Sequence, residues 1–139
     1  MSKSYFRRIE ILSAIVFAGI IFMGFSSGAR AWEPVLPKGV QGPVSWNQNG
    51  KDGRYFVAVV QGTITEPTTG VVKTDADCMP DSQGLNHCHN IIELKTGKVI
   101  TIQNTHKMSE HRCLRPGEQV KLRPDGASSW AIVQTMSDS

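Results

Sequence analysis

All the histidines and cysteines of this 139-residue chain lie between positions 78 and 113. The same segment contains two of its five methionines. The residues are Cys78, Met79, His87, Cys88, His89, His106, Met108, His111 and Cys113. Imidazole, thiolate and thioether groups are the ligands that soft and borderline metal ions take in proteins. The segment therefore predicts a transition-metal site.

The predicted metal ligands are the histidines and one methionine: His87, His89, His106, Met108 and His111. Alternate side chains of a strand share a face, so the first two histidines would lie about 7 Å apart at Cα. Imidazole suits copper and zinc alike, and a thioether suits Cu(I). We expect copper, with zinc as the alternative. The simpler interpretation is that these histidines are scattered strand-end residues and that the methionine fills the core.

Strand pairing must bring these side chains together. The β-rich runs 87–94 and 99–105 flank a Lys-Thr-Gly-Lys turn, which predicts a hairpin with Gly97 at positive φ. With a two-residue loop, His87 pairs with His106, and three histidines share one face at the open end. A longer loop shifts the register by one residue and moves these histidines to opposite faces.

The three cysteines allow at most one intramolecular disulfide. We expect Cys113 to bond with Cys78 or Cys88, which would stabilise the loops around the hairpin by roughly 2–4 kcal/mol. The third sulfur would then be a metal ligand, an intermolecular bridge or a reactive thiol.

Residues 1–31 have the pattern of a secretory signal peptide, with a basic start, an apolar stretch and Ala29-Arg30-Ala31 at the cleavage position. An uncleaved membrane anchor is the alternative. We expect a periplasmic or secreted protein, which is membrane-anchored if the segment is retained. Without this segment the chain has 11 basic and 11 acidic residues, so its composition does not favour nucleic-acid binding.

The remaining chain predicts one small all-β domain. Residues 32–53 read as an irregular N-terminal arm that Trp32 or Trp46 pins to the domain, and residues 54–139 as a β-barrel. Short strands with turns every eight to twelve residues favour an antiparallel barrel of five to six strands, with a bulge or sharp bend at Gly62. The segment 75–86 reads as a polar loop. Its aspartates lack the glycine and glutamate of a calcium-binding loop.

The order LRPGEQVKL followed by SWAIVQT resembles the end of an OB-type barrel, and the resemblance covers Tyr55 to Thr135. In overall plan the chain is similar to small periplasmic OB-fold copper-binding proteins. In that comparison His106 and Met108 take the histidine position and one methionine position. The chain departs from the pattern by having cysteines and by lacking a tryptophan and a second methionine near Met108. The resemblance implies copper as the ligand.

Two functions follow as expectations. The first is an exported metal-binding protein that serves as a carrier, buffer or assembly factor. The second is a disulfide-stapled interaction module or accessory subunit of a periplasmic or membrane complex. We do not expect an enzyme, because the chain has no phosphate-binding loop, nucleophile elbow or HExxH motif. A redox enzyme that uses the free thiol is a weaker third option.

Overall fold

The structure is a computed structural model that describes residues 39, 41–43, 45–126 and 129–137. The predicted signal peptide, residues 1–31, and Trp32 at the start of the arm lie outside these residues. Within the described part of the chain, no helix has the length and apolar character needed to cross a bilayer.

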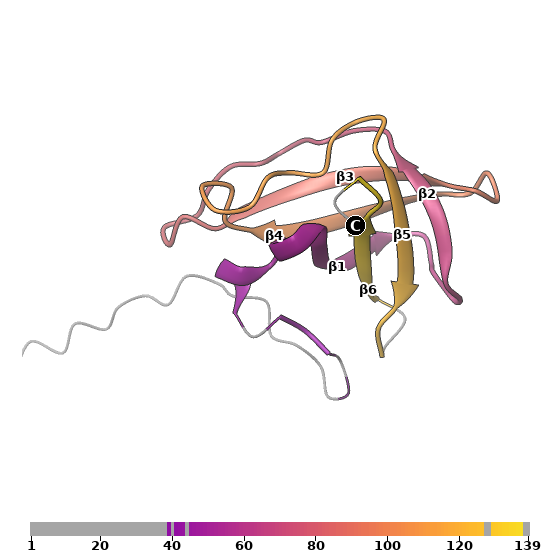
Figure 1. Ribbon diagram of the computed structural model, residues 1–139, viewed down its shortest axis with the longest axis horizontal. Coiled ribbons are helices and arrows are strands. Elements are labelled where there is room, and N and C mark those ends of the chain that lie inside the picture. The colour runs from indigo at the N-terminus through magenta and orange to yellow at the C-terminus, as the bar shows by residue number, and fades with distance from the viewer. Residues whose placement is uncertain (1–38, 40, 44, 127–128, 138–139) are drawn as a thin grey trace, which may run out of the picture.

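Six antiparallel strands form a closed barrel in the order β1-β4-β3-β2-β5-β6, and β6 pairs with β1 to close it (Figure 1). This confirms the expected all-β antiparallel barrel. The strands are β1 (Arg54–Gln61), β2 (Thr68–Val72), β3 (Asn86–Leu94), β4 (Val99–His106), β5 (Gln119–Pro124) and β6 (Trp130–Thr135). Two short 3-10 helices, η1 (Trp46–Gln48) and η2 (Lys51–Gly53), precede β1.

The strands show the residue preferences and alternation that barrels require. Strand β3 alternates buried and more exposed side chains from end to end, because one face lines the barrel interior and the other faces out. The pairing of β1 with β4 shifts between Val59 and Gln61, which places a bulge just before Gly62. Gly62 has φ of 83°, and a Cβ there would lie 2.8 Å from Cγ2 of Ile100. The strand irregularity expected at this glycine, a bulge or a sharp bend, is therefore present as a register shift directly before it.

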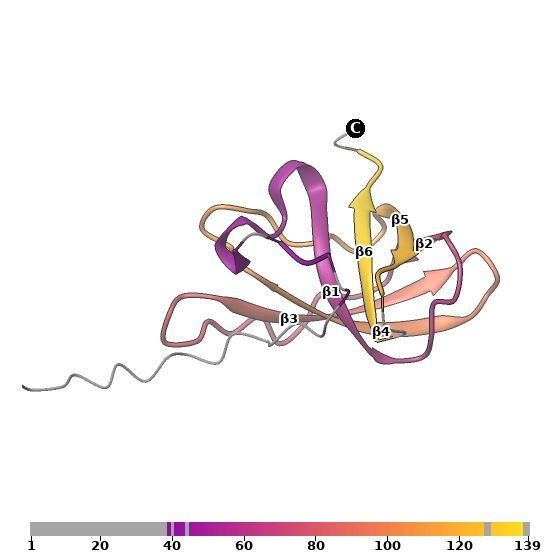
Figure 2. The ribbon, with the colours of Figure 1, turned by 90° about the horizontal axis from the view of Figure 1, so that it is seen from below.

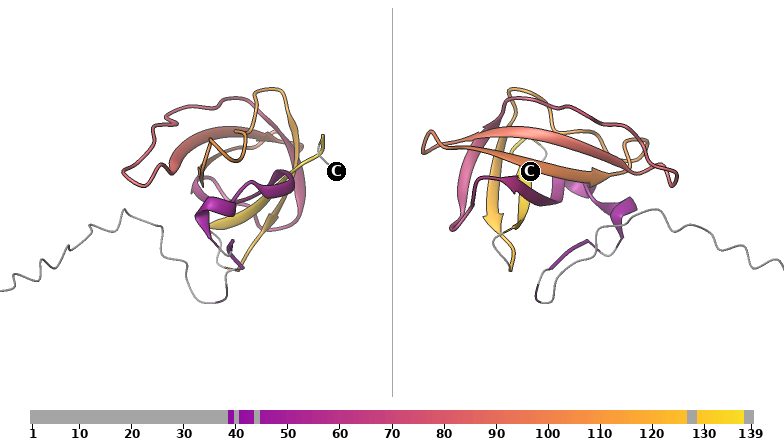
Figure 3. Two further views of the ribbon diagram at one scale, coloured as in Figure 1. Left: turned by 60° about the vertical axis from the view of Figure 1, so that its left-hand side comes forward. Right: turned by 180° about the vertical axis from the view of Figure 1, so that it is seen from behind.

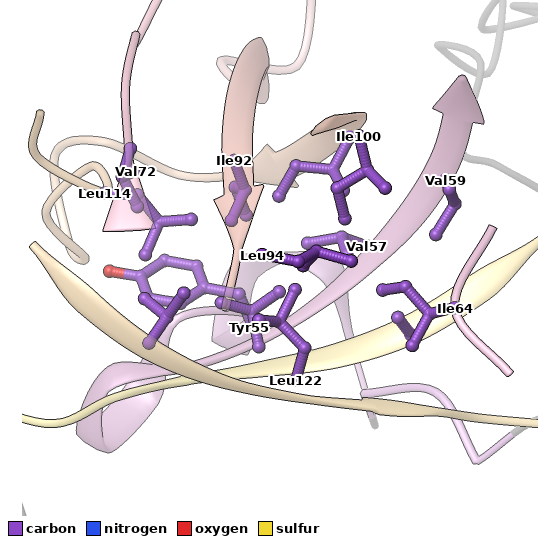
Figure 4. Packing of buried hydrophobic residues seen from close by; sticks show 14 residues of the cluster. Tyr55, Val57, Val59, Ile64, Val72, Ile92, Leu94, Ile100, Leu114 and Leu122 are labelled. Carbon is purple, nitrogen blue, oxygen red and sulfur yellow. The ribbon is translucent and has the colours of Figure 1, made fainter. Parts of the chain in front are cut away.

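Two apolar clusters stabilise the barrel. The larger one fills the interior, with Tyr55, Val57, Ile92 and Leu114 fully buried (Figure 4). Each such side chain contributes about 2 kcal/mol by leaving water. The smaller one lies where the arm meets the barrel.

The smaller cluster pins the arm, as expected for Trp46. Its ring is 5.9 Å from the Phe56 ring, and Phe56 stacks on Trp130 at 4.8 Å. Asn49, directly after η1, adds a polar anchor. Its Nδ2 donates to the carbonyls of Phe56 and Thr105, and its Oδ1 accepts from the N–H of Phe56. The end of the arm is therefore held by both apolar packing and hydrogen bonds.

The β3–β4 hairpin, which curves along one side of the barrel in Figure 3, has a longer loop than the two-residue turn. Glu93 pairs with Val99, and Leu94 N–H donates to the Lys98 carbonyl, so three residues form the loop. Gly97 has φ of 81°, as this loop type requires. The two-residue register is thus wrong by one residue. His87 pairs with Thr105, and His106 pairs with Asn86.

Candidate metal centre at the cysteines

Three sulfurs and one carboxylate converge at one place. One ligand atom from each of Asp75, Cys78, Cys88 and Cys113 lies within 4.8 Å of the other three. In the described part of the chain this is the only group of three or more His, Cys, Asp or Glu side chains close enough to hold a metal ion. It draws on three separate segments: the β2–β3 connection, β3 itself and the β4–β5 connection.

Strand β3 supplies the buried member of the cluster. Cys88 is in the middle of the strand, is fully buried and pairs across the hairpin with Asn104. The β2–β3 connection runs back along this strand and forms two antiparallel bridges to it, Ala76 with His89 and Pro80 with Asn86. These bridges bring Cys78 opposite Cys88.

The disulfide joins Cys78 to Cys88. The expected pairing, Cys113 with Cys78 or Cys88, differs from this, and Cys113 is the free cysteine. The reason is that the backbone of the 75–80 segment pairs with β3 and so brings Cys78 to Cys88. The sequence indicates only a polar loop there. Cys113 nevertheless lies beside the bond, inside the same cluster.

Anchors on both sides of Cys113 hold it at the cluster. The Tyr55 hydroxyl donates to the Arg112 carbonyl at 2.5 Å. The Arg112 guanidinium binds both oxygens of Glu118, at 3.1 Å and 2.6 Å. On the other side Leu114 is fully buried in the barrel core. A single residue between two such anchors has little freedom to leave the site.

Asp75 is the polar centre of the group. Its Oδ1 accepts a hydrogen bond from Asn90 Nδ2 at 2.9 Å and lies 3.3 Å from Sγ of Cys78. A disulfide sulfur has no proton to donate, so the second contact becomes a hydrogen bond only when Cys78 is a thiol.

The Cys113 thiol is protonated at neutral pH. Burial, the Asp75 charge and a hydrogen bond to Asp75 raise the pKa of Cys113 to about 11, and the nearby Arg112 lowers it by less. A thiol with such a pKa is a weak nucleophile near neutral pH, since the thiolate is the reactive form. A metal ion that displaces the proton would make it a ligand.

The barrel interior beside Cys88 is polar and incompletely hydrogen-bonded. Asn90 and Asn104 are fully buried. The Oδ1 of Asn90 and both side-chain polar atoms of Asn104 have no hydrogen-bond partner among the described residues. Unpaired buried polar groups are rare in native proteins.

The predicted histidine ligands lie in separate environments. Both ring nitrogens of His87 are engaged, with Thr105 Oγ1 and Asp81 Oδ2 each at 3.0 Å. His89 is 40% exposed, with Nδ1 3.3 Å from Asp77 Oδ2 in a geometry that makes no hydrogen bond.

His106 faces the barrel interior, where it is fully buried with its ring edge-on to Tyr55 at 5.7 Å. His111 follows β4 and is half-buried, and Met108 is 44% exposed. The group of potential ligands described above includes none of the four histidines. Metal binding by the five predicted residues stays a prediction.

Sequence reasoning did not select Asp75 or the three cysteines together as ligands. The sequence does contain the spacing Asp75-x-x-Cys78 and the pair Cys88-x-Asn90, which hold two of the cysteines, the aspartate and the asparagine that bonds to it. The link between them depends on the backbone bridges of the 75–80 segment, and no local pattern indicates these bridges.

No protein-family model, curated protein or solved structure matches this chain.

Proposed function

We propose that this is a small exported metal-binding protein whose site is Cys78, Cys88, Cys113 and Asp75 with the disulfide reduced. The observation that carries the proposal is the convergence of four potential ligands within 4.8 Å. Tetrahedral Zn–S bonds of ~2.3 Å place ligand atoms about 3.8 Å apart. The cluster therefore needs only small side-chain movements to surround one ion. We also propose the OB-type class for the barrel, and a role as carrier, buffer or assembly factor rather than as an enzyme.

Metal loading and the disulfide use the same sulfurs, so the two states exclude each other. Two electrons and two protons from a dithiol reductant convert the Cys78–Cys88 bond into two thiols. A metal ion then displaces the thiol protons, because thiolates are the form that binds metal. Cys113 takes no part in the disulfide and remains available as the third sulfur ligand.

Copper is the first choice of metal and zinc the alternative. Three thiolates satisfy Cu(I), which prefers soft ligands, whereas Zn(II) completes a tetrahedron by adding the harder Asp75 oxygen. The Asp75→Ala variant separates these metals. It should retain Cu(I) binding if copper is bound by the three sulfurs, and it should lose Zn(II) affinity if zinc requires the carboxylate.

The experiment is a titration of reduced and oxidised protein with Cu(I) and with Zn(II), followed by metal analysis. We expect one ion per reduced chain and none at this site in the oxidised chain. Cys113→Ser keeps the disulfide and should abolish stoichiometric binding after reduction, whereas His89→Ala, outside the cluster, should leave it unchanged. No stoichiometric binding by the reduced protein would contradict the proposal. If His89→Ala loses binding and Cys113→Ser retains it, the metal ligands are the predicted histidines and not the cysteines.

The second candidate is a disulfide-stapled interaction module or accessory subunit. The Cys78–Cys88 bond favours it, since it ties the β2–β3 connection to the barrel wall. The raised pKa of Cys113 disfavours the third option, a redox enzyme that attacks through this thiol near neutral pH.

A further inference from the structure

A basic groove lies on the outer wall of the barrel, on the strands β1, β6, β5 and β2 that Figure 2 shows in succession. Its volume is about 690 Å³. Four cationic side chains line it, Arg54, Lys95, Lys121 and Arg123, and its lining of described residues includes no carboxylate. The chain outside its predicted signal segment has balanced charges, so the fold concentrates positive charge here.

The strand register places the residues that line this groove side by side in one row across the strands. Thr69 of β2 pairs with Lys121 of β5, Lys121 pairs with Gln134 of β6, and Gln134 pairs with Arg54 of β1. Neighbouring strands are 4.7–4.9 Å apart, so the Lys121 and Arg54 positions are separated by about 10 Å.

The row continues beyond β2 and widens on β5. Lys95 follows β3, and its N–H donates to the carbonyl of Thr69 at 2.9 Å. Arg123 lies two residues after Lys121, and both point outward from the barrel. The cations therefore form a line across four strands with one branch along β5.

These charges are not neutralised within the described part of the chain. All four side chains belong to exposed residues, and none forms an ion pair with a described carboxylate. The lysine and arginine ion pairs of the described residues use other cations, as in Lys73 with Glu93. Exposed, unpaired cations in one groove produce a local positive potential that attracts an anionic partner.

We propose that this groove binds an extended acidic peptide segment of a partner protein. The inference is independent of the metal site. Carboxylates at alternate positions of an extended peptide are about 7 Å apart, which matches Lys121 and Arg123 at alternate positions on the outward face of β5. Thr69 and Gln134 lie between the cations, and the Thr69 hydroxyl and the Oε1 of Gln134 can bond to the backbone of such a peptide, while Gln134 Nε2 donates to the Asp52 carbonyl.

Other polyanions fit the groove less well. Binding of single-stranded nucleic acid usually includes stacking of bases on aromatic side chains, and the described residues that line the groove include no aromatic side chain. The apolar floor, Leu122 and Ile132, is 2% and 4% exposed and so offers little surface to acyl chains. The four unpaired cations would attract an anionic partner, and this part of the binding would weaken with salt.

The test uses a fluorescently labelled peptide of alternating Glu and Thr, with anisotropy measured at low and at physiological salt. Lys121→Gln with Arg123→Gln should weaken binding roughly tenfold, as two exposed ion pairs are lost. The matched control is Lys107→Gln with Arg115→Gln, which removes the same net charge outside the groove. This control should bind as the unmodified protein does.

Three results would overturn the proposal. The first is no binding of the acidic peptide at low salt. The second is equal weakening in both double variants, which would mean attraction by net charge alone. The third is tighter binding of a single-stranded oligonucleotide or of phosphatidylglycerol vesicles, with the same dependence on Lys121, which would assign the groove to that polyanion. Far-ultraviolet circular dichroism verifies that both variants fold.

Discussion

Asn90 donates a hydrogen bond from Nδ2 to Oδ1 of Asp75 at 2.9 Å, and so a fully buried amide orients the carboxylate at the centre of the cysteine cluster. The same amide group donates to the Thr74 carbonyl at 3.1 Å, which fixes its direction. The carboxylate consequently faces the sulfurs, where it can act as a proton acceptor in the oxidised protein and, in our proposal, as a ligand in the reduced one.

The first prediction concerns the acidity of Cys113. In oxidised protein it is the one free thiol of the chain, and its titration can be followed by thiolate absorbance. Asp75→Asn removes a negative charge, so the pKa of Cys113 should fall from about 11. It should stay above the ordinary value of 9.0, because burial is the larger cause and remains. Asp77→Asn, which changes an exposed carboxylate, should leave it unchanged. A Cys113 pKa unaffected by Asp75→Asn would contradict the proton contact.

The second prediction concerns pH and His106. Burial lowers the pKa of His106 below its ordinary value of 6.5, and the Asn104 backbone and the Asp75 charge offset this only in part. As pH falls below 6.5 the unfolded chain takes up a proton that the folded chain does not, so stability is lost. The loss is about 1.4 kcal/mol for each pKa unit of difference.

His106→Phe should remove this part of the pH dependence. It should cost little stability at neutral pH, because neither ring nitrogen has a hydrogen-bond partner of good geometry among the described residues. Chemical denaturation between pH 5 and 8 measures the effect, with His89→Gln, at a histidine that is only partly buried, as the control. An identical slope in His106→Phe and in the unmodified protein would show that His106 is not the group responsible.

The third prediction concerns the anchor beside the cluster. Glu118 is 8% exposed and accepts from Arg112, from the Arg115 N–H and from Ser137. Burial alone would raise the pKa of Glu118, but these hydrogen bonds outweigh it and hold the pKa below 4.5. Its contribution to stability is therefore present above pH 4.5 and is lost as pH falls through the lowered pKa.

Glu118→Gln should cost roughly 1–3 kcal/mol at neutral pH, because the two charged hydrogen bonds between Arg112 and Glu118 lose their ionic character. It should also weaken metal binding by the reduced protein, since Arg112 holds Cys113 in place. Glu110→Gln is the control, because Glu110 forms an exposed pair with Lys107. Full metal affinity in folded Glu118→Gln protein would show that the anchor does not position the thiol.

The fourth prediction concerns the arm. Asn49→Ala removes three hydrogen bonds and leaves buried backbone groups of Phe56 and Thr105 unpaired. We expect a loss of roughly 2–4 kcal/mol in the free energy of unfolding. Asn47→Ala changes an exposed neighbour in η1 and should be nearly neutral. Equal stability of the two variants in urea denaturation would mean that Asn49 does not anchor the arm.

Much of the barrel could be predicted from the sequence because strand formation has a local signal. The β-branched and aromatic runs of β1, β3, β4 and β6, the turn at Gly97 and the bulge before Gly62 all follow from residue preferences along a few positions. The burial of Trp46 against the barrel was also predictable, since a large aromatic in a polar arm must leave water.

The sequence by itself determined which residues could do chemistry, because cysteine and histidine are confined to positions 78–113. Only the tertiary structure decided which of them meet. A three-residue hairpin loop in place of a two-residue one moved His106 to the opposite face from His87, since side chains alternate along a strand. Backbone bridges between residues 76–80 and β3 joined Cys78 to Cys88 and brought Asp75 to Cys113. Pairing between segments distant in the chain depends on the closed barrel as a whole, so no local pattern contains it.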